Sequence, residues 1–384
     1  MMSLIPWWFL VSSVFAVTPE QVLKTAWNDK TYLSFEEIQA TDSKNPLRSV
    51  EGFVSSEEEE RDTESKIGLK FQFKSWPEWK TGRPKGTEQK LLRSASLGWA
   101  LKNRYNTLLI YELNRQKTAK LSQMIQLSER HVQAQTLSLR AGRSTSKSYI
   151  SARAELVKLK RSLSVLQQER QMLETRIQVW VPSWQEGSLE TLNLVSVEDV
   201  EQNLKASVVK GDSLTKKIAN EEIEQLTQEL TIVKGRENQW FKGVDVSQNR
   251  KKNDISYEIE VTLQLPFLFS DDLSKQKQNE LILKRALKQR DVEETGNRLE
   301  TLRVQILNLI EIYKDTQKLS RIQGGGLDPL ANIERKLAEE QEALDLLNQQ
   351  QEILSLYLEY LLESEILNNR PEKNYLDKSL KALL

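Results

Sequence analysis

Two segments of the chain alternate strictly between apolar and polar residues. In the first, Ile67, Leu69 and Phe71 alternate with glycine, lysine and glutamine as far as Lys74. In the second, every odd position from 255 to 265 is apolar. A two-residue period predicts β-strands with one apolar and one polar face. Together with two weaker patterns, it predicts four amphipathic strands, at about residues 47–56, 66–75, 239–247 and 254–265.

Most of the remaining chain has the period of long helices. Apolar residues at alternating spacings of three and four run from Tyr149 to Ile177, and again from Leu299 to Tyr313. This spacing is typical of coiled-coil seams. The glycine-containing stretches RAGRSTSK (140–147) and QGGGLDP (323–329) interrupt the pattern. We therefore expect one helical hairpin over residues 87–180 and a second over 271–367.

The order of these elements occurs twice, which predicts an internal duplication. The fold class is therefore mainly α with a small β part. We place the first repeat at residues 17–181, an irregular bridge at 182–212, the second repeat at 213–368 and a loose C-terminal tail at 369–384. The second repeat opens with a helix over 213–234. The first has far fewer residues before its strands, so its leading helix is predicted to be shortened or absent.

Composition narrows the chemistry. Residues 1–16 are mostly apolar and end in small residues, which predicts a secretory signal peptide, although no lysine or arginine precedes the apolar run. The 384 residues include 55 basic and 55 acidic ones, so a nucleic-acid partner is not expected. The chain has no cysteine and one histidine, His131, which is expected to be an exposed helical residue. We expect no enzyme activity, no catalytic residues, no cofactor and no metal site.

The four strands allow two interpretations. They form a small sheet packed against the helices, or they contribute to a membrane β-barrel, whose strands need about 9–11 residues. Glu258 and Glu260 suit a water-filled lumen better than a buried core. A barrel must close, and four strands are too few, so several chains would have to share one.

The alternation assigns residues to the two faces of such a barrel. Pore-lining positions are Lys70, Gln72, Glu258, Glu260 and Gln264. Lipid-facing positions are Leu69, Phe71, Phe73, Ile259, Val261 and Leu263. Aromatic residues at the helix-proximal strand ends would lie at the membrane interface, and these are Trp76, Trp79, Trp240 and Phe267.

Three stretches resemble the TolC-like outer-membrane efflux protein family, the outer membrane factors. They are RAGRSTSKSYISARAEL (140–156), YEIEVTLQLPFLFSDDLSKQ (257–276) and GGGLDPLANIERKLAEEQEAL (324–344). The resemblance implies a homotrimer in which each chain gives four strands to a shared trimeric transmembrane β-barrel in outer-membrane lipid, with the helices in the periplasm. It also implies a periplasmic adaptor protein and an inner-membrane transporter as partners, in tripartite efflux or type I secretion.

The same resemblance places the two helical turns at a periplasmic aperture where the adaptor docks. The residues concerned are Gly142, Arg143, Ser144, Thr145, Gly325, Gly326, Asp328 and Asn332. Asn332 stands where an acidic gate residue is usual in the family, so a weaker acidic gate is expected here. The alternative function, in which the strands form a packed sheet, is a soluble periplasmic coiled-coil scaffold or adaptor protein.

Overall fold

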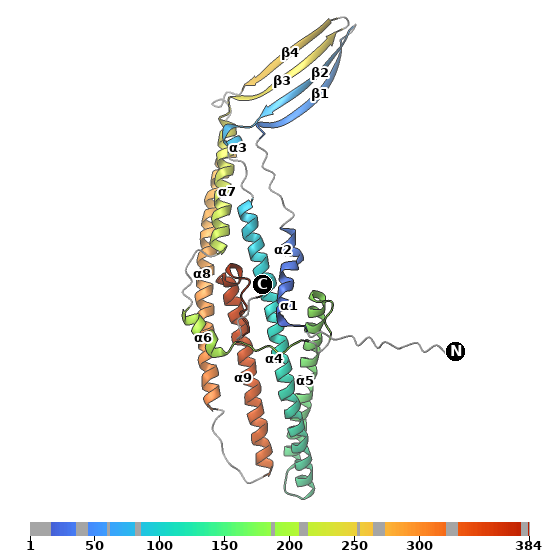
Figure 1. The fold of residues 1–384 in the computed structure, drawn as a ribbon, viewed down its shortest axis with the longest axis vertical. Coiled ribbons are helices and arrows are strands. Elements are labelled where there is room, and N and C mark those ends of the chain that lie inside the picture. Colours follow the sequence, from blue (N-terminus) through green and yellow to red (C-terminus); the bar gives the residue numbers. More distant parts are fainter. Residues whose placement is uncertain are drawn as a thin grey trace, which may run out of the picture. The chain divides into compact units, whose positions relative to one another are not determined.

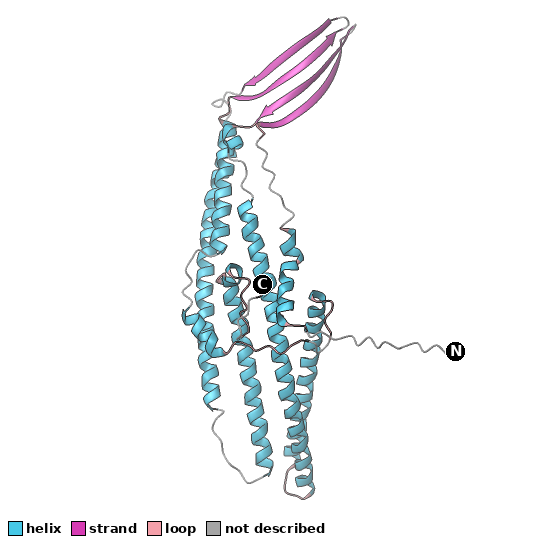
Figure 2. Ribbon diagram, viewed as in Figure 1, coloured by secondary structure: helices cyan, strands magenta, loops and turns pink. Residues whose placement is uncertain are grey.

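The computed structural model describes residues 17–35, 45–59, 62–80, 86–185, 189–206, 214–251, 254–263, 273–319, 329–377 and 383. These residues form helices and one four-stranded sheet (Figure 2). Among them, no helix is apolar enough over a sufficient length to cross a membrane. The predicted signal peptide lies outside the described residues.

The chain divides into two compact units. One comprises Met1–Ser34, Arg93–Gly211 and Gly296–Leu384, and the other comprises Phe35–Leu92 and Asp212–Thr295. Each unit takes segments from both predicted repeats. The duplication is therefore a feature of the order of elements along the chain, and it does not divide the chain into one compact unit per repeat.

The helical unit is built on long antiparallel helices. Its main elements are α4 (Gly86–Arg140), α5 (Ser146–Trp180), the second part of α8 (Leu273–Leu319) and α9 (Pro329–Glu363). Shorter elements are α1 (Pro19–Lys24), the 3-10 helix η1 (Thr25–Asn28), α2 (Lys30–Ser34), α6 (Val197–Ala206) and α10 (Ile366–Asn369). The described residues before the first strand thus contain short helices only, as the sequence predicts for the first repeat.

One apolar core joins these helices. Leu101, Tyr105 and Leu108 of α4 are fully buried, as are Ile353 and Leu358 of α9. Their spacing of three to five residues puts each set on one face of its helix. The seam predicted on α5 also points inward, since Leu159, Leu173 and Ile177 are buried there.

Two segments expected to be irregular are instead part of this core. In the predicted bridge, Ser196 and Asp199 form a capping box that begins α6, and Val200 and Leu204 of this helix are fully buried. In the predicted loose tail, Leu376 is buried, and its carbonyl accepts a hydrogen bond of 2.8 Å from the amide of Val195. The pattern of three or four apolar residues in each segment was too short to reveal this packing.

The second unit contains the sheet. Its strands are β1 (Leu47–Glu59), β2 (Asp62–Phe73), β3 (Phe241–Lys251) and β4 (Asp254–Leu263), all antiparallel and in the order β1-β2-β3-β4 (Figure 1). The short helix α3 (Trp76–Lys80) follows β2, and α7 (Leu214–Glu237) precedes β3. Leu226 and Leu230 of α7 pack with Leu281 at the start of α8.

The strands differ from the prediction at their ends. The acidic run after Ser56 was expected to be a loop, but Glu58 pairs with Thr63 and Glu59 with Asp62. Antiparallel pairing satisfies backbone groups even where the side chains are charged and solvated, so the hairpin extends into this run. In the second hairpin, β3 runs on to Lys251.

Candidate functional site

The register gives the sheet one apolar face and one polar face. Leu69 lies opposite Gly52 on β1 and Val246 on β3, and Val246 lies opposite Ile259 on β4. Directly paired residues of antiparallel strands share a face. The described positions predicted to face lipid therefore lie together on one side of the sheet: Leu69, Phe71, Phe73, Ile259, Val261 and Leu263.

The apolar face is not packed under helices. Val54 is 75% exposed, Ile259 is 70% exposed and Leu69 is 49% exposed. A contiguous exposed apolar surface of this kind marks a partner or a membrane. The exposure argues against the small packed sheet, which would bury these side chains beneath the chain's own helices.

The opposite face carries charge. Lys70 of β2 lies opposite Glu51 and Asp245, and Asp245 lies opposite Glu260, so one charged row crosses all four strands. Lys70 Nζ lies 3.8 Å from Asp245 Oδ2. The structure thus brings together the described positions predicted to line a pore, Lys70, Gln72, Glu258 and Glu260, whereas Gln264 lies outside the described residues.

Two further polar contacts fix this face. Lys66 Nζ lies 2.7 Å from Glu258 Oε2, and Asn249 Nδ2 donates a hydrogen bond of 3.3 Å to the same oxygen. Sequence analysis did not include Lys66, Asp245 or Asn249. The strict alternation of β2 and the register of its neighbours would have found them.

One aromatic residue lies on the polar face. Phe53 is directly opposite Gly68, and a Cβ atom on Gly68 would come within 2.6 Å of the Phe53 ring. Gly68 therefore leaves the space that this ring occupies. Only the register shows why a glycine interrupts the otherwise polar row of β2.

Tryptophans gather at one end of the sheet. β2 ends at Phe73 and β3 begins at Phe241, and the two rings lie 5.2 Å apart between centroids. Just beyond the strands, Trp76 and Trp79 stack edge to face with their centroids 5.1 Å apart, and Trp240 is largely exposed. Phe267, the fourth predicted interfacial aromatic, lies outside the described residues.

A carboxylate joins this end of the sheet to α7. Glu78 of α3 accepts hydrogen bonds from Arg48 at the start of β1, at 2.7 Å, and from Arg236 near the end of α7, at 2.6 and 3.1 Å. Partial burial disfavours the charged form of Glu78, but the hydrogen bonds from Arg236 and Arg48 outweigh it and lower its pKa to about 2. We refer to Glu78, Arg48 and Arg236 as the clasp.

The first helical turn has a defined geometry. The amide of Arg143 donates to the carbonyl of Ser138 at 2.8 Å, and that of Gly142 donates to Leu139 at 3.0 Å, which is a Schellman motif. Gly142 has φ of 70°, in the left-handed region that favours glycine. Thr145 then caps α5 by accepting a hydrogen bond of 3.3 Å from the amide of Ser148.

The lone histidine lies near this turn and is buried, contrary to expectation. His131 is 7% exposed, and its Nε2 lies 3.3 Å from Oε1 of Glu334 on α9. It continues a buried row of α4 at spacings of three and four, from Leu121 through Met124 and Ser128, and that spacing was the signal available in the sequence.

The second turn is only partly described. Gly325, Gly326 and Asp328 lie outside the described residues. Asn332 lies in the first turns of α9, where its Oδ1 accepts a hydrogen bond of 3.1 Å from Arg335 of the same helix. Of the acidic residues near the expected gate, the neighbouring Glu334 is thus the one that contacts the first hairpin.

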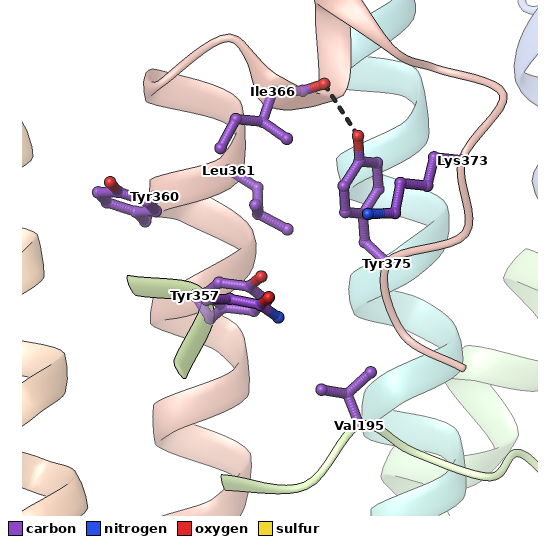
Figure 3. A pocket seen from close by; sticks show the side chains of 8 residues that line it. Val195, Tyr357, Tyr360, Leu361, Ile366, Lys373 and Tyr375 are labelled. Carbon is purple, nitrogen blue, oxygen red and sulfur yellow. Dashed lines mark hydrogen bonds between the residues drawn. The ribbon is translucent and has the colours of Figure 1, made fainter. Parts of the chain in front are cut away.

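A small cavity of about 160 Å³ lies beside the C-terminal tail (Figure 3). Tyr375 donates hydrogen bonds of 3.2 Å and 3.3 Å to the carbonyls of Ile366 and Arg370. Burial raises the pKa of Tyr357 and of Tyr375 to about 12, so both stay neutral donors at ordinary pH. Elsewhere in the described part of the chain, no cluster of three or more histidine, cysteine or acidic residues is placed to hold a metal ion.

No protein-family model matches the sequence, and no curated protein matches it. Solved structures do. CusC, studied for its folding and transmembrane channel formation, is 12% identical with a TM-score of 0.59, covering 91% of this chain and 93% of its own. The outer membrane protein VceC of Vibrio cholerae is 13% identical with a TM-score of 0.54, covering 91% and 95%. The open MtrE outer membrane channel of Neisseria gonorrhoeae is 10% identical with a TM-score of 0.53, covering 90% and 88%.

These likenesses extend over nearly the whole chain and over nearly the whole of each compared protein. At 10–13% identity they establish the fold. The chain therefore has the TolC-like fold of outer-membrane channel proteins, as its three motif stretches predicted. This fold combines long helical hairpins with a four-stranded sheet that closes into a barrel only in a trimer.

Proposed function

We propose that this chain is one subunit of an outer-membrane export channel. The observation that carries the proposal is the two-faced sheet, whose apolar side chains are exposed while charged rows cover its other side. In the proposed assembly the apolar face contacts outer-membrane lipid and the charged face lines a water-filled pore. Trp76, Trp79 and Trp240 then lie at the membrane interface.

The dimensions of the strands support this assignment. β4 has 10 residues and β2 has 12. At about 3.4 Å per residue and a tilt of about 45°, a ten-residue strand spans roughly 24 Å, close to the apolar band of about 25 Å in outer-membrane barrels.

The edges of the sheet support a shared barrel. β1 and β4 are the two edge strands of the sheet. Edge strands have backbone groups that cannot face lipid unpaired, so β1 of one copy pairs with β4 of the next. Three copies give twelve strands, and the fold favours this homotrimer.

The helices also have an unpartnered surface. On α5, five apolar side chains at spacings of seven or eight residues are each more than half exposed: Ile150, Val157, Val165, Met172 and Val179. Such a stripe suits packing against another helix. It supports assembly of several copies, with the helical unit in the periplasm of a bacterial cell.

We assign the transport role by analogy with the channel fold. The subunit acts as a passive conduit from periplasm to exterior in tripartite efflux or type I secretion. An inner-membrane transporter supplies the energy, and a periplasmic adaptor docks at the helical turns around Gly142 and Asn332. The chain itself has no catalytic role in this scheme.

Membrane extraction and conductance test the proposal. The full chain should remain in the membrane after carbonate washing, run as a heat-sensitive oligomer in detergent and conduct ions in planar bilayers. Glu260→Lys, on the polar face, should shift the ion selectivity toward anions. The matched control Glu293→Lys, on exposed α8, should leave the selectivity unchanged.

Release by carbonate as a protein that forms no conducting oligomer would overturn the proposal. It would favour the alternative, a soluble periplasmic scaffold or adaptor protein. A conducting channel whose selectivity is unaffected by Glu260→Lys would overturn the assignment of the polar face to the pore.

A further inference from the structure

A chain of polar contacts joins the first helical turn to α9. Ser144 in the turn donates a hydrogen bond of 2.6 Å to Oε1 of Gln135 on α4. The Gln135 amide nitrogen lies 3.3 Å from Nε2 of His131, and this Nε2 also lies 3.3 Å from Oε1 of Glu334 on α9. His131 is therefore the link between the two hairpins in this chain of contacts.

The contacts define which ring nitrogen carries the proton. Nε2 faces the Glu334 carboxylate, which can only accept a hydrogen bond when ionised, so Nε2 must donate. Turning the Gln135 amide end for end then directs its oxygen toward the ring and its NH2 group toward the Ser144 hydroxyl. The neutral Nε2–H form of His131 thus keeps every contact in the chain.

A second proton has no favourable place. The other ring nitrogen, Nδ1, is buried and has no hydrogen-bond partner among the described residues. Protonation would put a charged N–H group there, and a buried donor without an acceptor loses its solvation without compensation. The gain in attraction to Glu334 is small, because that side chain is 58% exposed and exposed ion pairs contribute little.

The surrounding charged groups do not change this balance. From α9, Glu334 is the acid within ion-pairing distance of the ring, and the next charged side chain, Arg335, pairs with Glu339 of its own helix. Glu129 of α4 pairs with Lys160 of α5 at 2.8 Å. In the described part of α5, no acidic group lies within ion-pairing distance of His131.

We propose that His131 is a positioning residue that ties the start of α9 to the first hairpin, and that acid releases this tie. Histidine is the side chain whose charge ordinarily changes between pH 5 and 8. The description of this end of the helices as the aperture of a channel rests on the proposed function, and there the release makes opening easier in acid. The tie itself does not depend on that function.

Hydrogen exchange of the full-length protein in detergent measures the tie directly. After correction for intrinsic rates, amides of residues 329–340 should exchange roughly three to ten times faster at pH 5.5 than at pH 7.5, relative to the second half of α9. His131→Gln should abolish this difference, because glutamine still donates to Glu334 but does not titrate. Glu334→Gln should retain the difference, because the titrating ring remains.

Lys120→Gln is the matched control. Lys120 Nζ lies 2.9 Å from Oε2 of Glu340, so this pair also joins α4 to α9. Because neither group titrates between pH 5.5 and 7.5, the substitution should speed exchange equally at both pH values and leave the acid response intact.

Imidazole nitrogen NMR provides a readout that does not depend on any variant folding. The chain contains a single histidine, so its spectrum holds one imidazole, which should show the Nε2–H form at pH 7.5. An Nδ1–H form, equal or slower exchange of the α9 start in acid, or an acid response that persists in His131→Gln would each overturn the proposal. A wild-type protein that does not conduct would overturn the proposed function and leave this result standing.

Discussion

Ile259→Lys tests whether the exposed apolar face meets lipid or water. Ile259 is near the middle of β4, opposite Val246, and is 70% exposed in the single chain. In water, a substitution at so exposed a site changes stability by about 0.5 kcal/mol or less. At the bilayer midplane, a lysine on the lipid face of a barrel costs about 2–4 kcal/mol, so three copies would cost about 6–12 kcal/mol per trimer.

The control uses the next residue. Glu260 lies on the opposite face, beside Asp245, so Glu260→Lys places the same charge in the proposed pore and removes one of two adjacent acids. The assay is urea unfolding of the oligomer in lipid vesicles, together with the temperature at which it dissociates in detergent. We expect a large loss for Ile259→Lys and a small change for Glu260→Lys. Equal and small effects for the two variants would refute the assignment of this face to lipid.

Three further predictions concern the clasp, the first turn and the sheet. Because its pKa falls from an ordinary value of 4.5 to about 2, ionised Glu78 stabilises the fold above about pH 4.5, and this stability is lost as the pH falls toward 2. Melting temperatures measured across that range should show this component in the wild type and not in Glu78→Gln. Gly142→Ala should destabilise by about 1–2 kcal/mol because of its positive φ, whereas Gly296→Ala, at an equally open site inside α8, should stabilise by about 0.5–1 kcal/mol. Equal effects in chemical denaturation would contradict the turn geometry. Gly68→Ala should cost about 1–3 kcal/mol by displacing the ring of Phe53, and Phe53→Ala in the same chain should recover part of that loss. Strictly additive effects in a double-mutant cycle would show that the ring does not occupy this space.

The elements with a strong local period were predictable. The alternation from Ile67 to Lys74 and from Ile255 to Leu265 depends only on the two-residue geometry of a strand, so it assigned side chains to faces before any pairing was known. The same holds for the inward face of α5. The strand ends were less predictable, because pairing between charged residues such as Glu58 and Thr63 depends on the partner strand.

Contacts between distant segments were not predictable. Glu78 acquires its low pKa from Arg48 and Arg236, and the latter is 158 residues away along the chain. His131 is conspicuous in the sequence as the single histidine, yet only the packing of α9 against α4 brings Glu334 to its ring. A periodic pattern reports which face of an element is buried, but not which residue of another element lies against it.

The sequence by itself determined that this chain forms long helical hairpins and strands with one apolar and one polar face, because both properties follow from the repeat of a single backbone geometry. The tertiary structure decided that the apolar face stays exposed, that the tail packs into the helical core and that His131 is buried against a second hairpin. Those outcomes depend on how separate elements pack together, and burial of apolar surface and pairing of polar groups are settled only when all the partners are in place.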